Sequence, residues 1–362
     1  MYDLQRLQSD AYVLLKQLIA SPSFSGQEDK TADLIERFLA ERQIPTKRIH
    51  NNIIARNKYF DAQKPTLLLN SHHDTVRPVN GWQSDPFKPT EKDGKLIGLG
   101  SNDAGAPLVS LLATFVRFYD APDLPYNIVI AATGEEENSG AHGIRSVLPE
   151  IGHIDLAIVG EPTGMEMAVA EKGLMVLRCR AHGKAGHAAR DVGENAILNA
   201  MEDIRWFASY RFPKVSTNLG PVKMTVTMIH AGELHNVVPD RCDFTVDVRT
   251  TEMYSNEEIL NTIKENIQSE ILKASLNLRP SSIPTEHPLV RVARKIGIKT
   301  TGSPTLSDQT YIQAPSVKMG PGESPRSHTA NEFIFKKELE DGIETYIRLL
   351  EEFFSREKEA SA

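Results

Sequence analysis

Four short apolar runs in this chain end in side chains that can bind metal ions. The runs at residues 67–70, 96–99, 128–131 and 156–159 lead into His72, Asp103, Glu135 to Glu137, and Glu161, respectively. Short apolar runs bounded by Gly, Asn and Pro predict buried strands. In open α/β sheets, ligands gather just beyond the carboxyl ends of the strands. Because these donors are oxygen and nitrogen without thiolates, they predict a site for zinc, cobalt or manganese.

The composition of the whole chain argues against several classes of protein. A length of 362 residues with 40% hydrophobic residues predicts two domains with full cores. No apolar stretch approaches the roughly 20 residues that span a bilayer. A formal charge of −7 without a Lys/Arg block argues against nucleic acid or a membrane as a partner. The N-terminus lacks a secretory signal, and two distant cysteines, Cys179 and Cys242, fit a reducing cytoplasm.

Helices and strands alternate through residue 171, which predicts an α/β fold with a mixed sheet and helices on both faces. Helices are expected within the first ~50 residues. A capping box at residues 25–28 is expected to open one that ends at Pro45. Another helix is predicted from Ala106 to Phe118, with Pro107 in its first turn. The α/β pattern resumes near His287 and closes with a helix over residues 337–354.

Residues 172–283 follow a different pattern, which predicts a smaller inserted α+β sandwich. Strands are expected at residues 174–181, 222–229, 242–248 and about 276–279, and helices at residues 195–210 and 255–271. The second helix begins with a capping box at Ser255. We therefore predict a discontinuous catalytic domain, residues 1–171 and 284–362, interrupted by this inserted domain.

The strand-end residues support a hydrolytic centre. His72 and Asp74 point the same way on an extended segment, so Asp74 can orient the ring of a metal-binding His72. Asp103 lies in a glycine-rich turn, and its two oxygens can bridge two ions. Of the adjacent Glu136 and Glu137, one can bind metal while the other holds a water as general base. Glu161 and the late His328 complete the set. Each residue alone is better explained as a cap, a solvated loop or a packed histidine, and their shared placement favours a site.

These motifs resemble the co-catalytic zinc amidohydrolases that include acetylornithine deacetylase, succinyl-diaminopimelate desuccinylase, aminoacylase and carboxypeptidase G. The matching segments are His72–His73–Asp74–Thr75–Val76, Asp103 in Gly-Ser-Asn-Asp-Ala-Gly, the Glu136–Glu137 pair before Gly140, Gly160–Glu161–Pro162–Thr163, and His328 before Asn331–Glu332. The resemblance implies Glu136 as the base. It implies two zinc ions, or cobalt or manganese, with one held by His72, Glu161 and Asp103 and the other by His328, Glu137 and Asp103. Ser71, Glu135 and Ala104 depart from the usual residues without removing a ligand.

The inserted domain resembles the dimerisation or lid domain of the same family. His187, in Gly-Lys-Ala-Gly-His-Ala-Ala, is similar to a histidine that reaches the partner's active site and stabilises the oxyanion. Asn236 and Arg249 resemble residues that contact the substrate. Arg190 stands where the family often has a proline. The resemblance therefore implies a homodimer formed through the inserted domain.

The expected reaction is hydrolysis of a small N-acyl amino acid in the cytoplasm. N-acetyl- or N-succinyl-ornithine or citrulline, in arginine biosynthesis, fits the resemblance best. A succinyl-diaminopimelate desuccinylase and a metallo-dipeptidase or aminoacylase are the enzymatic alternatives. A metal-dependent binding protein without activity is disfavoured because every ligand and the base are present.

Overall fold

The computed structural model describes residues 3–190 and 192–361, which divide into two compact units. The larger unit comprises Met1–Val169, Ser282–Thr301 and Ser307–Ala362, and the smaller unit comprises Ala170–Ser281 and Gly302–Leu306. Among the described residues, no helix combines the length and apolar character needed to cross a membrane.

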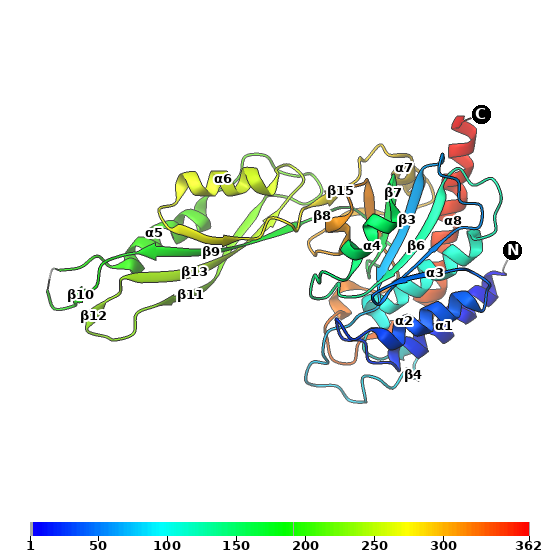
Figure 1. The fold of residues 1–362 in the computed structure, drawn as a ribbon, viewed down its shortest axis with the longest axis horizontal. Coiled ribbons are helices and arrows are strands. Elements are labelled where there is room, and N and C mark those ends of the chain that lie inside the picture. Colours follow the sequence, from blue (N-terminus) through cyan, green and yellow to red (C-terminus); the bar gives the residue numbers. More distant parts are fainter. Residues whose placement is uncertain (1–2, 191, 362) are drawn as a thin grey trace. The chain divides into compact units, whose positions relative to one another are not determined.

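The larger unit is built on a nine-stranded mixed sheet (Figure 1) with the order β1-β2-β6-β3-β7-β17-β8-β15, and β16 pairs with β8. The strands are β1 (Lys47–Ile49), β2 (Asn52–Arg56), β3 (Thr66–His72), β6 (Asn127–Thr133), β7 (Leu156–Gly160), β8 (Met167–Glu171), β15 (Ser281–Ser282), β16 (Thr300–Ser303) and β17 (Ser316–Met319). The four central strands β6, β3, β7 and β17 are parallel. Their carboxyl ends therefore meet at one edge of the sheet.

Alternate residues of these strands enter two separate cores. Leu67 and Leu69 pack into one core and Leu68 into the other, as the period-two alternation of a strand requires. The first core is covered by helices α1 (Leu4–Ile19), α2 (Asp29–Ala40), α3 (Ala106–Phe118), α7 (Pro288–Lys295) and α8 (Lys336–Ser361). The second is covered by α4 (Ile144–Ile151) and a stretch after the short 3-10 helix η2 (Asp308–Tyr311). A sheet covered on both faces confirms the predicted α/β class.

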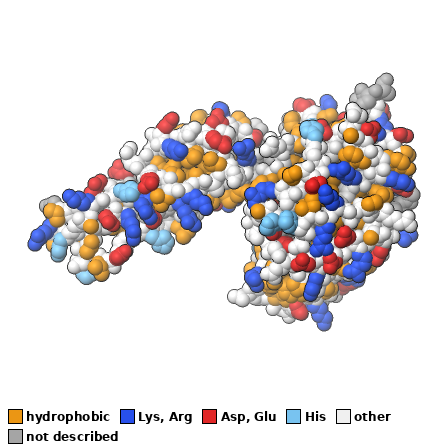
Figure 2. All heavy atoms as spheres, in the orientation of Figure 1, with side chains coloured by type: hydrophobic (Ala, Val, Ile, Leu, Met, Phe, Trp, Pro, Cys, Tyr) orange, Lys and Arg blue, Asp and Glu red, His pale blue; other side chains and the backbone are white. Residues whose placement is uncertain are grey.

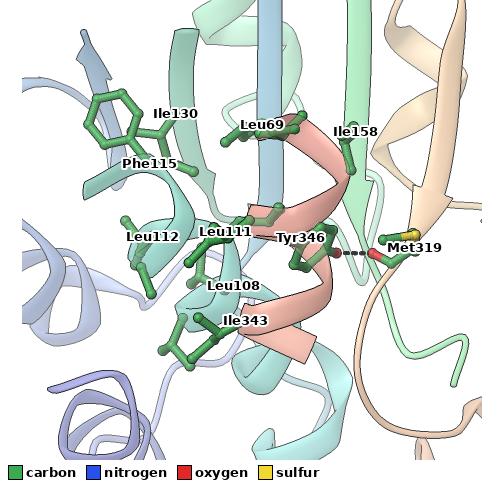
Figure 3. Packing of buried hydrophobic residues seen from close by; sticks show 14 of the residues in the cluster. Leu69, Leu108, Leu111, Leu112, Phe115, Ile130, Ile158, Met319, Ile343 and Tyr346 are labelled. Atoms are coloured by element: carbon green, nitrogen blue, oxygen red, sulfur yellow. Dashed lines mark hydrogen bonds between the residues drawn. The ribbon is translucent and has the colours of Figure 1, made fainter. Parts of the chain in front are cut away.

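Helices α3 and α8 supply the centre of the first core (Figure 3). Leu111 and Phe115 of α3 lie against Leu69 and Ile130 of the sheet, beside Tyr346 of α8. The hydroxyl of Tyr346 donates a hydrogen bond to the carbonyl of Met319, at the carboxyl end of β17. The helix from Ala106 to Phe118 has the predicted bounds, with Pro107 in its first turn.

One of the four apolar runs does not join the main sheet. Residues 95–97 form β5 (Lys95–Ile97) in a separate three-stranded sheet with β4 (Thr90–Lys92) and β18 (Phe333–Phe335). The prediction of four equivalent strand ends was therefore wrong. Gly98 and Gly100 interrupt the run, and Gly100 adopts a left-handed φ of 75° that turns the chain into the π-helical segment η1 (Ser101–Gly105).

The smaller unit is a four-stranded antiparallel sheet with two helices on one face. Its strands β9 (Gly173–His182), β11 (Lys223–Ala231), β13 (Arg241–Thr250) and β14 (Glu270–Ala274) have the order β11-β13-β9-β14. Helices α5 (Ala196–Ser209) and α6 (Asn256–Asn266) cover the face that buries Leu177, Cys179 and Phe244. A two-stranded ribbon joins β10 (Gly186–His187) to β12 (Val237–Val238). This is the α+β arrangement that the sequence predicted.

The two predicted capping boxes had opposite outcomes. The capping box at Ser255 and Glu258 is present and opens α6. The proposed box at residues 25–28 is absent: α2 begins at Asp29, and Ser25 donates instead to Asp74, at 2.7 Å. Tertiary contact thus overrode a local signal.

Helix α6 also ends earlier than predicted, at Asn266 rather than residue 271. The backbone N–H groups of Gln268 and Ser269 donate to the buried carboxylate of Asp203 on α5, at 3.1 and 2.8 Å. These bonds draw the chain out of the helix and into β14, which lies at Glu270–Ala274 rather than near 276–279.

We expect Tyr346→Phe to lower the free energy of unfolding by about 1 kcal/mol, because it removes the buried hydrogen bond from the tyrosine hydroxyl to the Met319 carbonyl while keeping the ring. Urea unfolding followed by circular dichroism measures this. The control is Tyr59→Phe, whose ring is half exposed and which should change stability little. Equal stability of Tyr346→Phe and wild type would show that the hydrogen bond to the Met319 carbonyl does not stabilise the fold.

Candidate metal centre

His72 lies at the carboxyl end of β3 and is fully buried. Its Nδ1 is 3.0 Å from the carbonyl oxygen of Asp74, which leaves Nε2 facing the carboxylates of the site. Nε2 is 3.8 Å from an oxygen of Glu161 and 3.8 Å from an oxygen of Glu136. The ring is thus oriented by its neighbour and presents one nitrogen to a cluster of acids, as a metal ligand requires.

Asp103 lies between the two histidines of the site. Its Oδ1 is 3.3 Å from His72 Nε2, and its Oδ2 is 3.6 Å from His328 Nε2. One oxygen thus faces each histidine, which is the arrangement of a carboxylate that bridges two ions. Asp103 comes from η1 rather than from a strand of the main sheet, and the peptide bond that follows it is cis.

Glu136 and Glu137 follow β6 in a tight turn that Asp74 holds. The two oxygens of Asp74 accept the backbone N–H groups of Glu136 and Glu137, each at 3.1 Å. Glu137 lies 3.0 Å from His328 Nε2, whereas Glu136 lies on the His72 side. Ligand atoms of His72, Asp103 and Glu137 all lie within 4.8 Å of one another, as do those of His72, Glu136 and Glu161.

The electrostatics of these residues fit a pair of divalent cations. Burial, added to the charge of Asp103, raises the pKa of Glu161 to about 8. Burial, with the charges of Glu161 and Asp308, also raises the pKa of Glu136 well above its ordinary value. So many carboxylates desolvated together are costly unless cations offset them. An oxygen-rich set with two imidazoles and without thiolates suits zinc, cobalt or manganese.

The histidines of the centre carry raised pKa values for a related reason. The hydrogen bond to Glu137 raises the pKa of His328 to about 9. For His72, burial disfavours the charged form, but hydrogen bonds to Asp103 and Asp74 hold its pKa well above the ordinary value. In both rings the pKa is raised by carboxylates that face Nε2, the nitrogen that would bind an ion.

His73 plays a different part from its neighbour His72. Its Nδ1 lies 2.8 Å from the Thr31 hydroxyl and its Nε2 lies 3.0 Å from the Asn51 carbonyl, so both nitrogens are engaged. Burial lowers its pKa to about 4. His73 is a packed, neutral histidine that ties β3 to α2.

The remaining predicted residues lie in the smaller unit. His187 is exposed on β10, and its Nδ1 accepts the backbone N–H of Ala189 at 3.1 Å. Asn236 is exposed, and its carbonyl accepts the N–H of Ala188. The guanidinium of Arg249 forms a forked pair with Asp247, at 2.8 and 3.1 Å. Their roles in catalysis and substrate binding stay predictions.

Three buried acids that support the site were missed from the sequence. Glu28 accepts the backbone N–H of Glu135, Asp308 accepts the Thr133 hydroxyl, and Glu332 accepts N–H groups around Asp103. Burial raises the pKa of Asp308 to about 7 and that of Glu332 to about 8. Glu332 belongs to the His328 motif and Glu28 to the predicted capping box, so the sequence pattern suggested other roles for both, and Asp308 stands in a segment without a distinctive pattern.

Comparison with known proteins places these features in a family. The model of peptidase family M20/M25/M40 matches residues 68–352. An acetylornithine deacetylase from Proteus mirabilis is 28% identical over 95% of this chain and 97% of its own length. Among solved structures, the aminopeptidase PepT from Bacillus cereus has a similar fold, with a TM-score of 0.76 and 21% identity over 96% of this chain and 98% of its own. A dinuclear metal-binding M20 peptidase from Bacillus subtilis has a TM-score of 0.71 with 16% identity, over 96% and 98% of the two chains.

We expect Asp74→Asn to weaken metal binding by roughly 10–100-fold, because an amide has one acceptor oxygen, whereas both oxygens of Asp74 accept N–H groups of the turn that carries Glu136 and Glu137. Zinc retained after dialysis against buffers of defined free zinc measures the effect. The control is Asp155→Asn, which changes a carboxylate that accepts the Thr66 N–H at the opposite end of β3. Equal zinc retention by the two variants would contradict the role given to Asp74.

Proposed function

The chain belongs to peptidase family M20/M25/M40, and we propose that it hydrolyses the N-acyl amide of an amino acid with the help of two divalent ions, zinc by preference. The observation that carries the proposal is the Asp103 carboxylate, which turns one oxygen to His72 and the other to His328. On this proposal His72 and Glu161 complete one ion site, and His328 and Glu137 complete the other.

The reaction assigns separate tasks to the residues around the centre. When bound, the ions polarise the amide carbonyl and lower the pKa of the attacking water. Glu136 accepts a proton from that water at its carboxylate and passes it to the nitrogen of the leaving amine. Burial raises the pKa of the Glu136 carboxyl, which favours its holding the proton between the two transfers. Asp74 keeps the His72 ring and the Glu136 turn in place.

The proposed substrate is N-acetyl- or N-succinyl-ornithine or citrulline, in arginine biosynthesis in the cytoplasm. The support is a relative named acetylornithine deacetylase that aligns along 95% of the chain. The buried free thiols of Cys179 and Cys242 agree with a reducing compartment. The fold is also similar to that of an aminopeptidase, which keeps a peptide substrate as the second candidate.

We further propose that the smaller unit forms a homodimer. Strand β11 is the edge of its sheet, so its outer backbone groups can pair with a second copy. Met228 and Ile229 of β11 and Leu198 of α5 are half exposed or more. Figure 2 shows hydrophobic side chains at the surface of this unit, between Lys, Arg and acidic groups. In such a dimer His187 and Asn236 would serve the partner's site, and Arg249 would contact the substrate.

A hydrolysis panel with zinc-loaded protein tests the substrate. It comprises the N-acetyl and N-succinyl forms of ornithine, citrulline and diaminopimelate, together with one dipeptide. We expect a clear preference for an acylated ornithine or citrulline. Activity only on the diaminopimelate compounds or the dipeptide would show that the proposed substrate is wrong. No hydrolysis by protein with two bound ions would refute the proposed reaction.

Two variants serve as controls for the panel. Glu136→Gln should keep both ions and lose roughly 10²–10⁴-fold in turnover, because the amide cannot accept the proton of the water. Glu135→Gln changes the adjacent carboxylate, which contacts His142 instead of the centre, and should keep most activity. Near-wild-type turnover of Glu136→Gln would show that another group is the base.

Mixing two inactive variants tests whether His187 acts across the dimer. His187→Ala and Glu136→Gln should each be nearly inactive, but after subunit exchange each mixed dimer holds one intact site. An equal mixture should therefore recover about a quarter of wild-type activity. A mixture of Glu136→Gln with Asp103→Asn should recover nothing, because both residues belong to one chain's centre. No recovery in the first mixture would place the action of His187 within its own chain.

A further inference from the structure

Glu332 is a buried carboxylate beside the metal centre that the reaction does not use. It is 2% exposed and follows His328 by four residues. Its Oε1 accepts the backbone N–H groups of Asn102 and Asp103, at 2.8 and 2.9 Å. Its Oε2 accepts the N–H of Gly100, at 3.1 Å. One side chain thus collects three donors from the turn that carries Asp103.

That turn exposes its backbone donors because of its conformation. Gly100 is left-handed, and within η1 both Asp103 (φ −116°, ψ 103°) and Ala104 (φ −116°, ψ 34°) depart from helical backbone angles. Backbone N–H groups that a turn points toward one side form a ready site for an anion. In a buried turn each such donor would be costly without an acceptor, and Glu332 supplies an acceptor to three of them.

Asn102 makes a second connection between the same two segments. Its side-chain amide donates to the Glu323 carbonyl at 3.2 Å and to the Ser327 hydroxyl at 3.3 Å, and its Oδ1 accepts the Glu323 N–H at 2.9 Å. The Ser327 hydroxyl also hydrogen bonds the Asp103 carboxylate. The turn at 100–103 and the segment at 323–332 are therefore joined on both sides of His328.

We infer that Glu332 is a positioning residue, which sets the bridging carboxylate of Asp103 against His328 before any ion binds. A bridging carboxylate must meet two ions at once, so a small rotation of the turn weakens both sites together. His328 is half exposed and has a left-handed backbone, with φ 58°. Such a ligand depends on its segment being held, and Glu332 holds that segment to Asp103. The inference rests on the proposed two-ion centre.

The test compares Glu332→Gln with Asp203→Asn. An amide offers one acceptor oxygen, so Glu332→Gln leaves at least one turn N–H facing an NH₂ group. Asp203 is also a buried carboxylate with three donors, the N–H groups of Gln268 and Ser269 and the Ser269 hydroxyl, but it belongs to the smaller unit. Both variants remove a comparable set of hydrogen bonds, and only one touches Asp103.

For wild type and both variants, zinc dissociation constants are measured by competition with a chelating dye. Thermal unfolding is measured without metal, and the absorption spectrum is recorded with two cobalt ions bound. Both variants should unfold at a lower temperature than wild type. Only Glu332→Gln should raise the zinc dissociation constants, by roughly 10–100-fold, and alter the cobalt bands. Asp203→Asn should keep the wild-type zinc dissociation constants and the wild-type cobalt bands.

Wild-type zinc constants and cobalt bands in Glu332→Gln would overturn the inference and leave the proposed function standing. A wild-type protein that binds fewer than two ions would instead overturn the proposed function. Should Glu332→Gln not fold, Glu332→Asp replaces it, since it keeps the charge but shortens the reach. That variant should also bind zinc more weakly than Asp203→Asn, and equal binding would overturn the inference.

Discussion

A carboxylate shared between two histidines is the interaction on which the rest of this structure depends. Asp103 faces His72 at the end of β3 and His328 on a loop more than 200 residues later in the chain. His72 reaches the site from the end of a parallel strand of the main sheet, whereas Asp103 lies in η1 and His328 lies on the loop before β18. The desolvation of Glu136 and Glu161 in the same place is the cost of that arrangement, and bound cations would offset it.

Further buried carboxylates hold the centre from outside. Asp74 accepts the N–H groups of the Glu136–Glu137 turn, Glu332 accepts those around Asp103, and Glu28 accepts the N–H of Glu135. Each acid thus satisfies backbone donors in a turn that cannot satisfy them itself. The centre therefore consists of ligands on turns, with each turn shaped by an acid from another segment. This division explains why acids that bind no ion are buried there.

Local signals predicted the elements well where neighbours in sequence are also neighbours in space. The capping box at Ser255, the helix from Ala106 to Phe118 and the strands that lead to His72 and Glu161 all follow from periods and caps. The failures have a common cause. Ser25 donates its hydroxyl to Asp74 instead of capping α2, and the N–H groups of residues 268 and 269 donate to Asp203 instead of continuing α6. In both places a hydrogen bond to a distant segment overrode the local preference.

The sequence by itself determined the fold class, the alternation that buries both faces of the sheet, and which side chains could bind metal, because each depends on residue type and short-range spacing. Only the tertiary structure decided how those side chains meet. Asp103 comes from a turn beside a separate small sheet, and the acceptors that shape it, such as Glu332, lie about 230 residues away in the chain. Long-range hydrogen bonds to buried carboxylates carry no local pattern, so they become visible only once the chain is folded.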